Sequence, residues 1–258
     1  MSEHPDSPDR KAASSVAVRP DARPALDIRA QAQWGVPKRV DRKPDRQERI
    51  TPMVDSVRAV IFDVGNVLYR WEPRALYARL IDDDRTLAAF LDTVATREWH
   101  FQHDAGRDFA DTSAELSAQY PQYAALIAQW GPRFNETLPG PVPGMVEIVE
   151  ELDAAGVPIF GITNFSHEFW PPFRAREEHV FGRFRDIVVS GDEKLIKPDP
   201  AIYRLALDRF GLAPAEAMFV DDSLPNVESA RAMGIHAVHF HDAAHFRGEL
   251  VRAGVLAP

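Results

Sequence analysis

The chain contains no cysteine among its 258 residues, which excludes disulfide bonds, thiolate metal sites and a cysteine nucleophile. It also lacks any apolar run close to the roughly 20 residues that a membrane-spanning helix needs. Its first residues have neither the basic start nor the apolar stretch of a secretory signal. We therefore expect a protein that works in the cytoplasm and has no membrane partner.

Positive charge is scarce as well, since the formal net charge is −9. The first 52 residues hold 11 Lys or Arg against 8 Asp or Glu, so the excess of acid lies in the rest of the chain. An acidic body binds a phosphate backbone poorly, and we expect no nucleic-acid partner. An anionic small-molecule substrate would then need a local positive group, either a metal ion or a specific lysine.

Residues 1–54 lack hydrophobic periodicity. They are rich in Pro, Arg, Asp, Ala and Ser, a composition that predicts a disordered extension because too little apolar surface is available for burial. Met53 stands directly before the first apolar run. The alternative is therefore that the natural chain starts at Met53 and that the upstream residues are wrongly assigned.

Beyond this extension, short apolar runs alternate with amphipathic segments. The runs predict β-strands at residues 57–63, 157–164, 187–190, 217–222 and 235–240. The amphipathic segments predict helices at residues 145–155, 201–210 and 227–233, each followed by a glycine that can end it. Strands that alternate with helices indicate right-handed crossovers and a doubly wound parallel sheet of the Rossmann-like α/β class.

Residues 73–138 interrupt this alternation. Their apolar residues recur at helical spacing, and strand-like runs are few, so we predict a helical cap domain inserted after the first strand. A Pro- and Gly-rich stretch at 139–144 follows it as a hinge. The catalytic core would then consist of residues 55–72 and 139–258.

Polar groups follow several predicted strands at the points where the strands end. They are Asp63, Thr163 with Asn164, Lys197, and Asp221 with Asp222. Because the carboxyl ends of parallel strands open onto one crevice, these side chains can meet although they are far apart in sequence. Each could also serve as a turn or capping residue, but four such coincidences at one sheet edge are improbable.

Four motifs resemble those of the haloacid dehalogenase (HAD) superfamily and occur in that family's order. They are residues 62–68 (FDVGNVL), 162–164 (ITN), 196–200 (IKPDP) and 219–223 (FVDDS). The resemblance implies a hydrolase in which Asp63 is the nucleophile and forms an aspartyl-phosphate. It further implies that Thr163, Asn164 and Lys197 bind the phosphoryl group. Mg²⁺ would be held by Asp63, the Gly65 carbonyl, Asp221 and Asp222, with Asn226 in support.

Gly65 departs from the pattern of the resembling phosphatases. These usually carry an aspartate two residues after the nucleophile, which protonates the leaving group and contributes about 10²–10⁴-fold to the rate. The departure leaves three alternatives: a phosphatase of small phosphomonoesters, such as sugar phosphates, that uses another acid; a 2-haloacid dehalogenase; or a non-catalytic binding protein. Retention of both Asp221 and Asp222 favours Mg²⁺ and a phosphorylated substrate.

Further predictions concern other polar and aromatic residues. His103 is our candidate for a substrate-binding cap residue, and His103 or Asp104 could replace the missing acid. Four aromatic residues after the second motif could either wall the cleft or seat the cap: Phe165, Phe169, Trp170 and Phe173. The histidines between 236 and 245 lie in a strand-like segment, and their spacing fits no zinc template.

Overall fold

The structure is a computed structural model, and it describes residues 57–258. The predictions about the extension at 1–54 and a start at Met53 lie outside the described residues. Within the described range, no helix is both long and apolar enough to cross a membrane.

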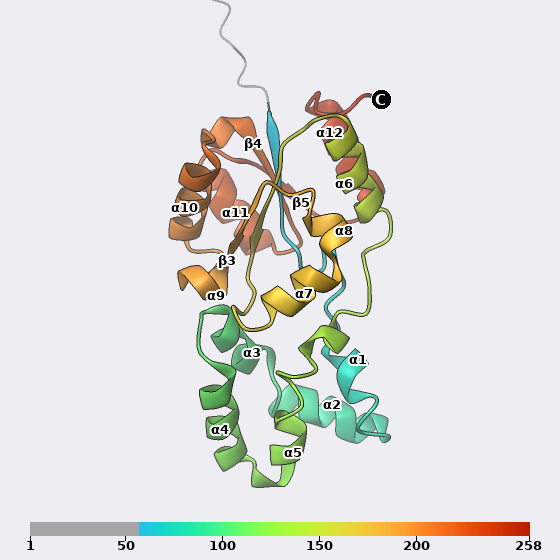
Figure 1. Ribbon diagram of the computed structural model, residues 1–258, viewed down its shortest axis with the longest axis vertical. Helices are drawn as coiled ribbons and strands as arrows, with labels where there is room; N and C mark the ends of the chain where they lie inside the picture. The colour runs from blue at the N-terminus through green and yellow to red at the C-terminus, as the bar shows by residue number, and fades with distance from the viewer. Residues whose placement is uncertain (1–56) are drawn as a thin grey trace, which may run out of the picture. The chain divides into compact units, whose positions relative to one another are not determined.

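A parallel five-stranded sheet forms the centre of the fold, in the order β3-β2-β1-β4-β5 (Figure 1). The strands are β1 Ala59–Phe62, β2 Ile159–Thr163, β3 Asp186–Val189, β4 Ala217–Asp221 and β5 His236–His239. The α/β class and the doubly wound parallel topology are thus confirmed. Four strands are one to three residues shorter than predicted, and β3 has the predicted length but starts one residue earlier; the predicted carboxyl ends Asp63, Asn164 and Asp222 are loop residues that line the cavity.

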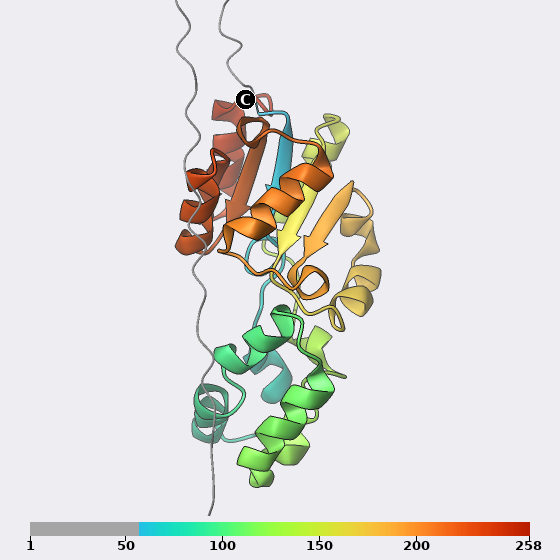
Figure 2. The same ribbon diagram turned by 90° about the vertical axis from the view of Figure 1, so that its left-hand side faces the viewer.

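Helices cover both faces of the sheet, as Figure 2 shows from the side. Alternate residues of β1 point to opposite faces of the sheet and belong to two separate apolar clusters. Val60 and Phe62 belong to the first cluster, and Ala59 and Ile61 belong to the second. The first cluster includes residues of α6 (Met145–Ala154), α7 (Trp170–Arg176), α8 (Glu178–Phe181) and α12 (Ala243–Arg252). The second includes residues of α10 (Pro200–Phe210) and α11 (Leu224–Ala232).

The glycines predicted to end helices adopt the required conformation. Gly156, Gly211 and Gly234 have φ of 71°, 67° and 86°, the left-handed region that only glycine enters without strain. Helix α11 starts three residues earlier than predicted, because Pro225 fits the first turn, where its missing N–H costs nothing.

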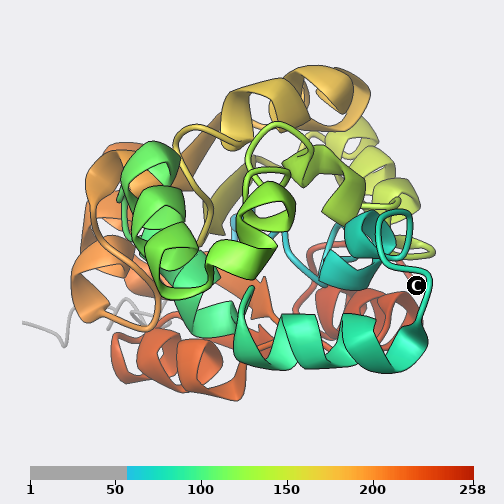
Figure 3. The same ribbon diagram turned by 90° about the horizontal axis from the view of Figure 1, so that it is seen from below.

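The segment between β1 and α6 is helical, as predicted, and lies beyond the carboxyl ends of the strands (Figure 1). We call residues 73–138 the helical insertion. Its elements are α1 Pro73–Tyr77, α2 Asp84–Thr93, α3 Arg97–Asp104, α4 Phe109–Gln119 and α5 Ala124–Ile127, with 3₁₀ turns at Pro121–Tyr123 and Phe134–Thr137. In Figure 3, which looks along the sheet from this end, the insertion lies in front of the strands. Its division from the core as a separate cap domain stays a prediction.

Aromatic side chains join the insertion to the core. The ring of Phe134 stacks on that of Phe169 with centroids 4.6 Å apart, and its edge meets Phe165 at 5.4 Å. Trp170 and Phe173 instead turn inward and pack on Phe181. Of the aromatic residues after the second motif, Phe165 and Phe169 therefore contact the insertion, whereas Trp170 and Phe173 pack in the core.

Backbone groups make a second junction at residues 104–109. Ser190, at the start of α9 (Ser190–Glu193), donates its hydroxyl to the carbonyl of Asp104 at 2.6 Å. The N–H of Phe109 donates to Glu168 Oε2 at 2.6 Å. Gly106 has φ of 87°, and a Cβ there would lie 2.8 Å from the carbonyl oxygen of Gly191. The two backbones approach so closely here that only glycine fits at position 106.

Candidate active site

Asp63 follows directly on β1 and is 7% exposed. Its N–H continues the sheet by donating to the carbonyl of Val220 at 3.0 Å, and its Oδ1 accepts the N–H of Val64 at 2.6 Å. These bonds fix the carboxylate at the level where β1, β2 and β4 end together, since Phe62 pairs with Gly161 and Val220. The carboxylate therefore points into the crevice beyond the sheet.

Lys197 reaches the same point from the loop before α10. Its Nζ lies 2.8 Å from Asp63 Oδ1 and 2.7 Å from Asp221 Oδ2, and it also donates to the carbonyl of Ile162 at 3.0 Å. Asn164 holds the lysine in place through its side chain, which accepts the Lys197 N–H at 2.8 Å and donates to the Lys197 carbonyl at 3.0 Å. The buried ammonium group thus links two carboxylates.

Three carboxylates gather around this lysine. Asp63, Asp221 and Asp222 each offer an oxygen, and these oxygens lie within 4.8 Å of one another. Asn226 donates its Nδ2 to both oxygens of Asp221, at 3.0 and 3.1 Å, and so orients that carboxylate. His239 contacts the Asp222 carbonyl at 3.0 Å, which assigns this histidine to the support of the loop.

This donor set fits Mg²⁺. Hard carboxylate oxygens are the ligands that Mg²⁺ prefers, and a partly hydrated ion needs few of them. The charges also fit, because one lysine cannot neutralise three carboxylates and a divalent cation would balance the remainder. Residues Asp63, Asp221 and Asp222 would hold the ion.

Burial and mutual repulsion raise the pKa values of these groups. Burial raises the pKa of Asp63 well above its usual range; Lys197 opposes this, while Asp221 and Asp222 add to it. Burial and the charge of Asp221 likewise raise the pKa of Asp222, against the effects of Asn66 and Lys197. Burial works to lower the pKa of Lys197, but its carboxylate partners outweigh burial and hold that pKa above its usual value. The lysine therefore stays charged at neutral pH.

Gly65 and Asn66 form the turn after the nucleophile. A Cβ placed on Gly65 would meet no atom within 4 Å, so the position faces open space on the cavity wall. Asn66 has φ of 57°, and its Oδ1 accepts the N–H of Trp71 at 3.0 Å. This bond ties the start of the insertion to the site, a role that we did not predict from the sequence.

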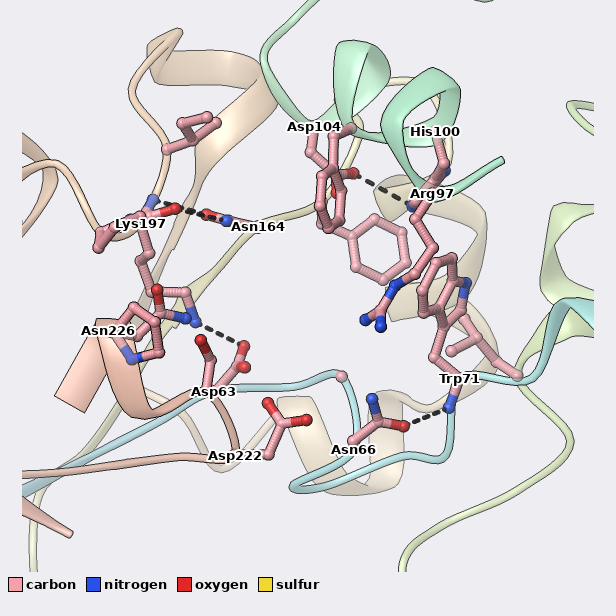
Figure 4. A pocket seen from close by; sticks show the side chains of 18 of the residues that line it. Asp63, Asn66, Trp71, Arg97, His100, Asp104, Asn164, Lys197, Asp222 and Asn226 are labelled. Atoms are coloured by element: carbon pink, nitrogen blue, oxygen red, sulfur yellow. Dashed lines mark hydrogen bonds and ion pairs between the residues drawn. The ribbon is translucent and has the colours of Figure 1, made fainter. Parts of the chain in front are cut away.

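A cavity of about 430 Å³ lies between the carboxylates and the insertion. Figure 4 shows Asp63, Asp222 and Lys197 on one side and Arg97, His100 and Asp104 on the other. Apolar side chains form much of the wall: Trp71, Phe101, Phe134, Leu138, Phe165, Ile196, Pro198 and Pro225. Arg97 stacks over Trp71 with its guanidinium carbon 5.4 Å from the ring centroid, and no carboxylate in residues 57–258 forms an ion pair with it.

The structure brings most of the predicted site residues together, with two differences. Thr163 is buried at the end of β2, but it is Asn164 that lines the cavity; the Thr163 hydroxyl has no hydrogen-bond partner in the described part of the chain. His103 does not reach the cavity at all. It is fully buried within the insertion, where its Nε2 lies 2.7 Å from the Thr112 hydroxyl, and the prediction that it contacts substrate disagrees with this position.

The prediction placed His103 in the cavity because the sequence does not show which face of α3 lines it. On α3 the residues that line the cavity are Arg97, His100, Phe101 and Asp104, which recur at i, i+3, i+4 and i+7 on one face of the helix. His103 lies on the neighbouring face and packs against Trp99 and Phe169. The spacing of His100 and Asp104 could have identified them as a pair, but not which face of the helix meets the cavity.

The fold and these residues define a class: a hydrolase with an aspartate at the end of the central strand of a parallel sheet. The family profile of haloacid dehalogenase-like hydrolases matches residues 57–234, more than half of the chain. The chain therefore belongs to this family.

Named relatives include phosphatases. A sesquiterpene phosphatase of Aspergillus oryzae is 31% identical over 196 residues, covering 74% of this chain and 93% of that protein. A phosphoglycolate phosphatase of Thiobacillus denitrificans is 32% identical over 195 residues, covering 69% and 80%. The magnesium complex of a HAD family enzyme from Bacteroides thetaiotaomicron matches with a TM-score of 0.58 at 16% identity, covering 76% and 99%, which shows the shared fold.

Proposed function

We propose that this protein is a Mg²⁺-dependent phosphatase that cleaves a small phosphomonoester through an aspartyl-phosphate on Asp63. The observation that carries the proposal is the contact of Lys197 with both Asp63 and Asp221 beside a third carboxylate, Asp222. A carboxylate nucleophile beside a lysine and a cation site suits phosphoryl transfer, in which catalysis is mainly positioning and charge stabilisation. The phosphatases among the relatives support the same reaction.

The position of each site residue indicates its role in phosphoryl transfer. Asp63 would attack phosphorus with its free carboxylate oxygen, while Val64 N–H and Lys197 hold Oδ1 in place. Lys197, which stays charged, would stabilise the negative charge on the phosphoryl oxygens, and the unpartnered hydroxyl of Thr163 lies at the adjacent strand end. Mg²⁺ bound by Asp63, Asp221 and Asp222, with the Gly65 carbonyl, would supply further charge neutralisation.

The rest of the cavity sets the substrate class. Its aromatic and aliphatic wall suits an organic group with apolar surface, which gains from leaving water. The unpaired Arg97 adds a place for a second anionic group at the far side from Asp63 (Figure 4). We propose a cytoplasmic enzyme whose partner is a small phosphorylated molecule and not a nucleic acid.

Steady-state phosphate release from a panel of esters tests the proposal. The panel contains p-nitrophenyl phosphate, n-hexyl phosphate, phosphoglycolate and a sesquiterpenyl monophosphate, each with Mg²⁺ or with EDTA. We expect Asp63→Asn and EDTA each to abolish turnover, while Asp208→Asn, an exposed aspartate on α10, leaves it unchanged. Turnover that survives Asp63→Asn would contradict the proposal. Halide release from 2-haloacids without metal would instead support the dehalogenase alternative, and ligand-induced stabilisation without any product would support a binding protein.

A further inference from the structure

A buried carboxyl group without a hydrogen-bond partner lies on the cavity wall opposite the nucleophile. Asp104, the last residue of α3, is 4% exposed, and its Oδ1 forms no hydrogen bond within residues 57–258. The Nε2 of His100 is 3.5 Å away, too long for a hydrogen bond. Buried polar atoms are nearly always paired in folded proteins, so an unpaired carboxyl oxygen on a residue that lines a cavity calls for an explanation.

His100 lies beside this carboxyl group and does not neutralise it. The imidazole is stacked between Trp71, at 4.8 Å, and Phe134, at 5.3 Å. Burial lowers the pKa of His100 well below its usual value, with smaller contributions from His103 and Arg97, so the ring is neutral. His100, the group nearest to the Asp104 carboxyl in these contacts, is therefore not a cation that could hold Asp104 ionised.

The opposite wall lacks a group that the reaction needs. Gly65 stands where the resembling phosphatases carry the aspartate that protonates the leaving group, and its side chain position is empty space on the same cavity. We propose that Asp104 is the general acid and base of this enzyme, which the insertion supplies in place of a carboxyl group at position 65. This inference rests on the phosphatase function proposed above.

Asp104 alone can donate the proton in the first step of the reaction and accept a proton in the second. In the first step a carboxylate oxygen of Asp63 bonds to phosphorus, the phosphorus–oxygen bond of the ester breaks, and its electron pair goes to the leaving oxygen. Protonated Asp104 gives its proton to that oxygen, and an alcohol departs. In the second step the Asp104 carboxylate takes a proton from water as the water oxygen attacks phosphorus. The bond from phosphorus to Asp63 then breaks, and both aspartates return to their starting states.

The surroundings of Asp104 suit such a role at neutral pH. Burial raises the pKa of Asp104 to about 7, and the charge of Lys197 opposes the rise. An acid that titrates near the working pH can both give and take a proton. The other titratable or charged groups around it are Asp63 and Asp222 across the cavity, Arg97, His100 and His103 on α3, and Asp192, Glu193 and Lys194 on and after the neighbouring α9.

Leaving groups of different basicity separate this role from a structural one. A hexanol oxygen must be protonated as it leaves, whereas a nitrophenolate departs without a proton. Asp104→Asn keeps the size of the side chain, and we expect it to lower kcat/KM for n-hexyl phosphate by about 10²–10⁴-fold and for p-nitrophenyl phosphate by less than about 10-fold. The matched control is Asp111→Asn, an exposed carboxyl on α4 of the same insertion, which should change neither value.

A second variant tests whether the acid can be moved. Because position 65 has free space, Gly65→Asp in the Asp104→Asn background should recover n-hexyl phosphate hydrolysis by about 10-fold or more. A purely structural role for Asp104 predicts no recovery and an equal loss for both esters, and either result would overturn the inference. If the unmodified protein hydrolyses neither ester, the phosphatase proposal itself fails, and this inference fails with it.

Discussion

Replacement of Lys197 by methionine should destabilise the protein strongly, because it leaves two buried carboxylates without their cation. Lys197 is 3% exposed, Asp221 is fully buried, and both Asp63 and Asp221 contact the ammonium group within 2.8 Å. Removal of one partner of a buried ion pair typically costs about 3–5 kcal/mol. Methionine has nearly the same volume as the lysine stem, so loss of packing adds little.

Urea unfolding in buffer with EDTA measures this effect. With an m value of about 2 kcal/mol per molar urea, a loss of about 4 kcal/mol lowers the unfolding midpoint by about 2 M. Lys194→Met is the matched control, since Lys194 is exposed and forms no ion pair among residues 57–258; its midpoint should stay close to that of the unmodified protein.

A double variant isolates the uncompensated charge as the cause. Addition of Asp221→Asn to Lys197→Met removes one stranded carboxylate, and the double variant should be more stable than Lys197→Met alone. The reasoning would be refuted if Lys197→Met unfolded within about 1 kcal/mol of the unmodified protein, or if the second substitution lowered stability further.

Two further predictions concern the insertion. Burial lowers the pKa of His103 to about 4, below the value of about 6.5 in an unfolded chain, so the unfolded state binds more protons and stability falls as the pH drops from about 6.5 towards 4. His103→Gln, which can still contact Thr112, should reduce this loss by up to about 3 kcal/mol, as measured by urea unfolding at acid pH. If the variant lost as much stability between about pH 6.5 and about pH 4 as the unmodified protein, the prediction would be contradicted. Arg97→Met should raise KM by about 10-fold for phosphoglycolate, which carries a carboxylate, and leave KM for n-hexyl phosphate unchanged; equal shifts for both esters would argue against an anion site at Arg97.

The sequence was sufficient to predict the sheet and the residues at its edge. The apolar runs that end in Asp63, Thr163 and Asp221 became β1, β2 and β4, because strands buried on both faces must be continuously apolar. Once the strands are parallel, their carboxyl ends lie together, so the contact of Lys197 with Asp63 and Asp221 follows from topology.

The insertion was less predictable, because both sides of α3 carry aromatic and polar residues. Trp99 and His103 face one way and Phe101 and Asp104 another, so periodicity alone does not tell which side is buried. The orientation is decided by contacts distant in sequence, such as the bond from Ser190 to the Asp104 carbonyl and the stacking of Phe134 on Phe169. The apolar pattern of one helix does not specify such partners.

The junction at residues 104–109 also bears on how substrate enters. Two hydrogen bonds help to hold it, from Ser190 to the Asp104 carbonyl and from the Phe109 N–H to Glu168, each with a net contribution of about 0.5–1.5 kcal/mol. His167 also approaches Asp108 at 3.4 Å, and the ring of Phe109 packs against Phe169. Loss of the two hydrogen bonds alone would cost about 1–3 kcal/mol, which corresponds to an opened population between about 15% and about 0.6%, and the other contacts lower it further. Opening of this junction would break only these contacts and would leave every helix intact. Because the two backbones approach closely at Gly106, even an alanine there would push the equilibrium towards the opened form.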